Sequence, residues 1–125
     1  MPGERLLTVQ LARHRWAIRL PELAGVCELP PLRPLPGVPG PVLGLAHRHG
    51  RIVTVLDLPA LLGDAPGEGP QTLLLAAPPR GQLAFCVRGE LRLALSEDGG
   101  PEEGPIRRVD LGRVLAPLER TGSGA

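Results

Sequence analysis

Residues 35–63 read LPGVPGPVLGLAHRHGRIVTVLDLPALLG, and this stretch has the clearest internal pattern in the chain. Two apolar runs, residues 42–46 and 52–56, flank the polar segment HRHG at residues 47–50. Apolar runs of this length between turn residues are typical of strands. Gly50 supplies the positive φ that a hairpin connection of three to five residues needs. The stretch therefore predicts a strand, a tight turn and a second strand.

The end of this stretch has the features of a short helix. Asp57 stands where a helix N-cap is expected, Pro59 falls in the first turn, and Gly63 suits the C-terminal stop. A second Asp-Leu segment, residues 110–115, follows an expected short strand at residues 106–109 and repeats the arrangement. We therefore expect an Asp-capped helical turn at both places.

The composition limits the kinds of function that the chain can have. Its 125 residues are 42% hydrophobic, which is enough for one domain with a core. A net charge of +1 and only 2% aromatic residues argue against binding of nucleic acid or an anionic membrane. There is no apolar run of roughly 18 residues to span a membrane, and the N-terminus lacks a signal-peptide pattern. Cys27 and Cys86 are far apart, so we expect free thiols and a cytoplasmic protein.

Outside the central stretch, short apolar runs alternate with turn residues. Residues 6–11 and 16–20 predict a first hairpin. A short helix is expected after Pro21, because Leu23, Val26 and Cys27 are spaced i, i+3 and i+4. The acidic segment SEDGGPEEGP and the tail TGSGA are expected to be mobile. Further strands are expected in four runs: 73–76, 83–87, 91–95 and 106–109.

Residues 30–41 contain six prolines among twelve positions. Such a segment is extended and is unlike a helix or a central strand. Its PLRP sequence, residues 31–34, also matches the PxxP pattern of ligands for proline-recognition domains. A structural connector is favoured, since the segment lies between elements that must pack together.

The two halves of the chain resemble each other. Each opens with a hairpin, at 6–20 and at 73–87, and each closes with a strand that leads into an Asp-Leu turn. Many short strands in two related units predict a mainly β fold of two small barrel-like sheets with short helices. We expect one domain over 1–125, made of a subdomain at about 6–63, a linker at 64–70, a subdomain at about 71–118 and a tail at 119–125.

Residues 44–58, GLAHRHGRIVTVLDL, resemble the signature hairpin of CheW-like domains, which runs roughly G-V-x-N-L-R-G-x-I-x-P-V-x-D-L. Upstream, residues 35–39 are similar to the L-P-x-x-P of that family, and residues 26–29 to its V-x-E-V/I segment. The resemblance is close over 6–63 and looser over 71–116. It implies two five-stranded SH3-like barrels with a hydrophobic groove between them, and no catalysis, cofactor or metal.

The resemblance also implies an adaptor that couples the cytoplasmic tips of chemoreceptors to the regulatory domain of the histidine kinase CheA. Arg48 and Arg51 flank the hairpin tip, where they could bind a partner or merely add charge. With them included, the candidate partner-binding residues are Val26, Glu28, Gly44, Arg48, His49, Gly50 and Arg51.

This sequence departs from the family pattern at several points. His47 stands for the tip Asn, His49 for the tip Arg, and Thr54 for the hairpin Pro. Arg88 occupies a place where an acidic residue is common. SEDGGPEEGP stands where the family usually has another strand pair. The second barrel can thus be complete or incomplete, and an incomplete one exposes an edge that the tail or a partner chain must cover.

Metal binding and catalysis are alternatives to the adaptor role. His47 and His49 have the spacing of two residues on one face of a strand, but a metal needs a third and usually a fourth ligand. Asp57 and Asp110 could form a catalytic carboxylate pair, although helix capping accounts for both. The sequence favours a non-catalytic adaptor. The alternatives are a degenerate CheW-like module that dimerises or scaffolds another partner, and a small metal-dependent enzyme.

Overall fold

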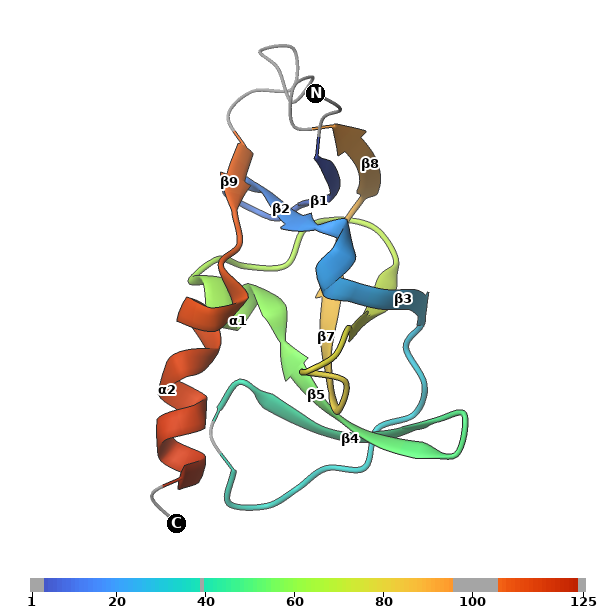
Figure 1. The fold of residues 1–125 in the computed structure, drawn as a ribbon, viewed down its shortest axis with the longest axis vertical. Coiled ribbons are helices and arrows are strands. Elements are labelled where there is room, and N and C mark those ends of the chain that lie inside the picture. The colour runs from blue at the N-terminus through green and yellow to red at the C-terminus, as the bar shows by residue number, and fades with distance from the viewer. Residues whose placement is uncertain (1–3, 39, 96–105, 124–125) are drawn as a thin grey trace.

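The computed structural model describes residues 4–38, 40–95 and 106–123, which form two β-sheets flanked by helices (Figure 1). The helical segments are the 3-10 turn η1 (Leu20–Glu22), α1 (Leu58–Leu62) and α2 (Leu111–Ser123). The strands are β1 (Arg5–Gln10), β2 (Arg15–Arg19), β3 (Leu23–Glu28), β4 (Val42–Arg48), β5 (Arg51–Asp57), β6 (Gln71–Ala76), β7 (Leu83–Arg88), β8 (Leu91–Leu95) and β9 (Ile106–Arg108). The expected mainly β fold with two sheets is confirmed.

Each sheet takes strands from both halves of the sequence. The four-stranded sheet has the order β8-β1-β2-β9, and the five-stranded sheet has the order β3-β6-β7-β5-β4. The first hairpin therefore pairs with strands from the end of the chain, and the β6–β7 hairpin pairs with β3 and β5. The sheets do not follow the expected division at residues 64–70, because alternation along a strand specifies its buried face but not its neighbour.

The main core lies between the two sheets. Leu7 and Ile18 enter it from the four-stranded sheet, and the fully buried Phe85 enters it from β7. Leu111 and Leu115 of α2 join the same cluster, so this helix closes one side of the core (Figure 1). The core is almost entirely aliphatic, as the low aromatic content requires.

A second apolar cluster fills the other face of the five-stranded sheet. Its buried members are Ala46, Val53, Val55, Leu73, Ala84 and Cys86. The proline-rich connector crosses this face, where Leu29 and Leu32 pack against the cluster. The connector then pairs with the outer edge of β4, since the N–H groups of Arg33 and Leu45 each donate to the other's carbonyl at 2.8 Å. These contacts support a structural connector.

The helix expected after Pro21 is wrong, because these residues form η1 and then β3. Leu23 and Cys27 are partly buried along β3, whereas Val26 between them is 48% exposed. The same apolar residues fit a strand as well as a helix, and antiparallel pairing with β6 decides in favour of the strand.

The C-terminal helix is longer than expected. α2 runs to Ser123, although a mobile tail was expected from Thr121. Asp110 caps it by accepting a hydrogen bond from the Arg113 N–H at 3.2 Å. Its buried leucines attach it to the core, which compensates for Pro117 inside the helix. Residues 96–105, also expected to be mobile, lie outside the described residues.

The cap of α1 differs from the expected one. Asp57 precedes the helix, but its side chain makes no capping hydrogen bond. A capping side chain accepts a hydrogen bond from the N–H of the second or third helical residue. Pro59 holds the second position, and proline has no N–H. The expected stop at Gly63 is confirmed by its left-handed φ of 71°.

Candidate protein-binding surface

The β4–β5 hairpin ends in a turn of two residues, shorter than the expected connection. Arg48 lies opposite Arg51, and His49 and Gly50 between them have φ values of 52° and 75°. Two positive φ values identify a type I′ turn, whose twist matches that of the strands. Since His49 lies in the turn and His47 in β4, the expectation that both imidazoles share one strand face is wrong.

Gly44 is buried, unlike the other candidate residues of this hairpin. A Cβ at this position would lie 2.5 Å from the carbonyl oxygen of Arg33. The glycine therefore lets the connector approach β4 closely, and the structure places it against its own chain.

An open pocket of about 430 Å³ lies between the hairpin tip and the β6–β7 turn. Arg48, His49 and Arg51 line it from the hairpin, and Ala24 from β3. The rest of its wall is Val53, Leu75, Ala76, Pro78, Pro79, Gly81 and Gln82. The structure thus brings together the tip residues that the sequence singled out and adds a wall that is mainly apolar.

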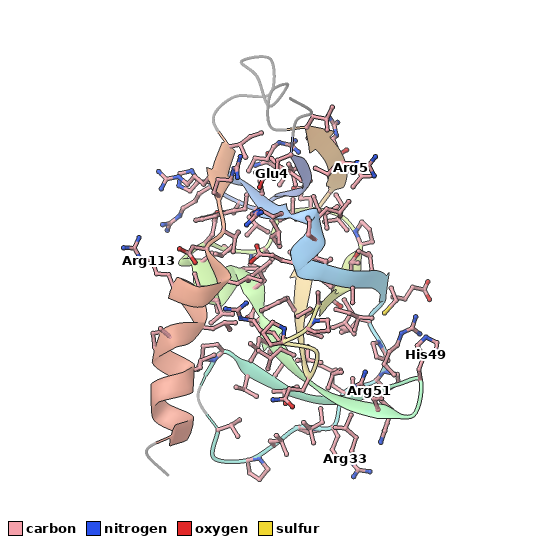
Figure 2. The ribbon with its side chains drawn as sticks, viewed as in Figure 1. Glu4, Arg5, Arg33, His49, Arg51 and Arg113 are labelled. Atoms are coloured by element: carbon pink, nitrogen blue, oxygen red, sulfur yellow. The ribbon has the colours of Figure 1, made fainter. Side chains whose placement is uncertain are left out.

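Three guanidinium groups at this end of the molecule have no partner in the described part of the chain. None of Arg33, Arg48 and Arg51 makes a side-chain hydrogen bond or ion pair there, and the Nε of Arg48 is buried without a hydrogen bond. Figure 2 shows Arg33, His49 and Arg51 at the same end of the molecule, far from Glu4 and Arg113. This end is therefore a cationic surface with no compensating carboxylate among the described residues that pairs with it.

Val26 and Glu28 lie exposed on β3, the strand that also carries Ala24. They do not line the pocket, so the structure separates them from the tip residues. Ile52, next to the tip on β5, is 57% exposed and is an apolar contact candidate that the sequence interpretation missed.

The β6–β7 turn is the other part of the site that sequence reasoning missed. Its PPRG sequence predicts a turn, but only the parallel pairing of β5 with β7 places that turn beside the hairpin tip. The position of Arg33 could not be predicted either, because it lies in the proline-rich connector. Its β-bridge to Leu45 places it beside β4. Neither pairing has a local sequence signal.

The side chains considered for metal binding do not gather into a metal site in the part of the chain that the structure describes. Among the described residues, no group of three or more His, Cys, Asp or Glu side chains is placed to hold a metal ion. Leu73 lies between Cys27 and Cys86 in the sheet register, and both thiols are free as expected. Burial raises the pKa of the Cys86 thiol, and the charge of Asp57 raises it further, so this thiol is a poor nucleophile.

Comparisons with known proteins agree with this architecture. The structure is similar to that of the scaffolding protein TtCheW from Thermoanaerobacter tengcongensis, with a TM-score of 0.76 and 14% identity over 92% of this chain and 88% of that one. Comparison with curated proteins found no match. No helix in the described ranges is long and apolar enough to cross a membrane. The sequence model of the CheW-like domain matches residues 5–92, more than half of the chain. The chain therefore belongs to the CheW-like domain family.

Proposed function

We propose that this chain is a cytoplasmic, non-catalytic scaffold of chemotaxis-type signal transduction that couples chemoreceptors to the regulatory domain of a CheA-type histidine kinase. The observation that carries the proposal is the family match over residues 5–92, which includes β3 and the whole β4–β5 hairpin. The likeness to a scaffolding protein over nearly the whole chain supports it.

Two kinds of surface support such a role. Val26 and Ile52 offer exposed aliphatic area, and burial of such area drives most protein association. Glu28 follows Val26 on β3, and Arg51 precedes Ile52 on β5 with Arg48 opposite it. Charges beside an apolar contact set orientation and encounter rate. Gly50 and His49 shape the turn that presents these arginines. Gly44 acts indirectly, by seating the connector against β4.

The experiment is calorimetric titration of the protein with the regulatory domain of a CheA-type kinase from the same organism. Val26→Arg and His49→Ala are tested after circular dichroism has confirmed that both fold. Val38→Arg, which changes another exposed valine, is the matched control. Micromolar or tighter binding that Val26→Arg or His49→Ala weakens, and Val38→Arg does not, supports the proposal. Folded wild-type protein that does not bind contradicts kinase coupling.

A second candidate function is self-association through β8, an edge strand of the four-stranded sheet. Leu93 on this strand is 72% exposed, the largest value among the exposed large apolar side chains of the described residues. An exposed apolar edge is a template for pairing with another strand. Sedimentation velocity tests this function, since a dimer that Leu93→Arg dissociates would support it and a concentration-independent monomer would exclude it.

A further inference from the structure

The hairpin tip holds two like charges in direct opposition. Arg48 and Arg51 are register partners across the β4–β5 ladder, and neither has a side-chain partner in the described part of the chain. Like charges directly opposite each other destabilise a sheet. Other arginines of the molecule are arranged differently, since Arg19 and Arg108 both pair with the carboxylate of Glu4. The positive charge of the tip is therefore not neutralised by an ion pair with any described residue.

The pocket beside these arginines has an aliphatic floor. Val53, Leu75, Pro78 and Pro79 line it, and the imidazole of His49 at the hairpin tip is the one aromatic ring among its lining residues. A floor of this kind accepts an aliphatic side chain and offers no ring on which a nucleic-acid base can stack. The guanidinium fork, in contrast, matches the geometry of a carboxylate.

We infer that this pocket binds an acidic segment of a protein partner, in which an aliphatic side chain stands beside one or more carboxylates. The aliphatic side chain packs against the Pro78–Pro79 turn, and the carboxylates pair with Arg48 and Arg51. Arg33 lies at the same end of the molecule and adds to the attraction (Figure 2). The identity of the partner rests on the proposed function, but the chemistry of the pocket does not.

The first test uses the kinase regulatory domain and the double variant Arg48→Glu/Arg51→Glu. The double variant is expected to lower affinity at least about tenfold at about 50 mM NaCl, and much less at about 300 mM, because salt screens exposed charges. Arg113→Glu, which reverses an exposed arginine far from the pocket, is the matched control (Figure 2). Equal affinity of wild-type and double-variant protein for a bound kinase domain overturns the inference and leaves the proposed function standing.

The second test does not depend on the kinase. The full chain, labelled with nitrogen-15, is titrated with a capped peptide of alternating Glu and Leu, with its Lys-Leu counterpart, and with vesicles containing phosphatidylserine. Saturable shifts at the amides of residues 48–51 and 81–82 with the Glu-Leu peptide alone, lost in the double variant, support the inference. No shifts, equal shifts with the Lys-Leu peptide, or binding to vesicles alone overturn it. If the wild-type protein fails to bind the kinase domain, the proposed function fails and this titration still decides the inference.

Discussion

The two sheets share one core but fill their other faces differently. In the five-stranded sheet that face is an aliphatic cluster covered by Leu32 of the connector and by Leu29 just before it. In the four-stranded sheet the corresponding face carries Thr8, fully buried beneath arginines. The Thr8 hydroxyl accepts a hydrogen bond from Arg15 at 3.2 Å and donates one to the Arg92 carbonyl at 3.3 Å. One sheet thus has an apolar cluster on both faces. The other has the main core on one face, and on its second face the buried Leu6 and Ala17 lie beside Thr8 and its polar contacts.

The arginines of the two sheets differ in the same sense. In the four-stranded sheet the Oε1 atom of Glu90 lies 3.9 Å from Nη2 of Arg15 and 3.3 Å from Nη2 of Arg92. Glu4 forms ion pairs with Arg19 and Arg108. In the five-stranded sheet Arg48 and Arg51 have no such partner among the described residues. The comparison shows that arginines form ion pairs within one sheet, whereas in the other the two tip arginines have no ion-pair partner among the described residues.

The largest expected effect is on the packed face. Leu73→Ala empties the centre of the aliphatic cluster, where Leu73 is fully buried, and should lower the free energy of unfolding by about 2–5 kcal/mol. Urea denaturation followed by circular dichroism measures the loss. The control is Leu93→Ala on the exposed edge strand β8, which should change stability by less than about 0.5 kcal/mol. Similar losses for both variants would contradict the packing difference.

The hairpins were predictable because each is specified locally. The alternation of apolar residues around Thr8 predicts β1, and the turn at Gly50 predicts the second hairpin. Both signals lie within a few residues, and both hairpins, β1–β2 and β4–β5, are present. The strand β3 was not predictable, because Leu23, Val26 and Cys27 satisfy the helical and the extended spacing alike and only β6 decides between them. The extent of α2 was missed for a related reason, since its stability comes from leucines buried against distant strands.

The candidate site likewise has one part that the local sequence predicts and one part that depends on tertiary pairing. The tip residues Arg48, His49 and Arg51 could be identified from the hairpin pattern and the family resemblance. The wall at Pro78–Pro79 could not, because the parallel β5–β7 pairing that brings it to the tip joins segments far apart in sequence. Local pattern thus found one side of the pocket, and tertiary pairing supplied the other.

Asp64 tests whether the two sheets unfold together. It follows α1, and its carboxylate accepts hydrogen bonds from the Trp16 indole at 2.9 Å and from the backbone N–H groups of Arg13 and His14. These contacts fasten the β1–β2 turn to the loop between the sheets. Asp64→Ala should cost about 1.5–3 kcal/mol of unfolding free energy, the range for hydrogen bonds to a charged group. A loss confined to β1 and β2 in hydrogen exchange would show that the sheets open separately.

The same residue predicts a pH dependence. Burial raises the pKa of Asp64, but hydrogen bonds from Trp16, Ala65, Arg13 and His14 outweigh it and hold this pKa below its ordinary value of 3.8. A lowered folded-state pKa adds stability above that value, and this stability is lost as the pH falls through the folded-state pKa. Acid unfolding of Asp64→Asn should therefore lack part of the wild-type decline below pH about 4. Parallel curves for the two proteins would contradict this role.

Thr8→Val tests the polar face of the four-stranded sheet. Valine keeps the shape of the side chain but removes the hydroxyl that links Arg15 to the Arg92 carbonyl. Because burial is unchanged, the expected loss is that of neutral hydrogen bonds, about 0.5–1.5 kcal/mol. Chemical denaturation measures it, with Thr72→Val on the five-stranded sheet as the control. Stabilisation by Thr8→Val would mean that this face tolerates an apolar filling like that of its counterpart.

The smallest expected effect is the one that best separates the two sheets. Arg51→Glu places a carboxylate opposite Arg48 and should raise the free energy of unfolding by about 0.2–1 kcal/mol. Arg48→Glu should do the same, and the double variant should lose the gain because two glutamates then face each other. The same reversal at Arg92 sets a glutamate beside Glu90 and should lower stability. Opposite signs in the two sheets, measured by differential scanning calorimetry at low salt, would confirm that the tip arginines are held at a cost to the fold. If reversing one of these charges stabilises the fold, then Arg48 and Arg51 are not needed for stability, and contacts with a partner explain their presence.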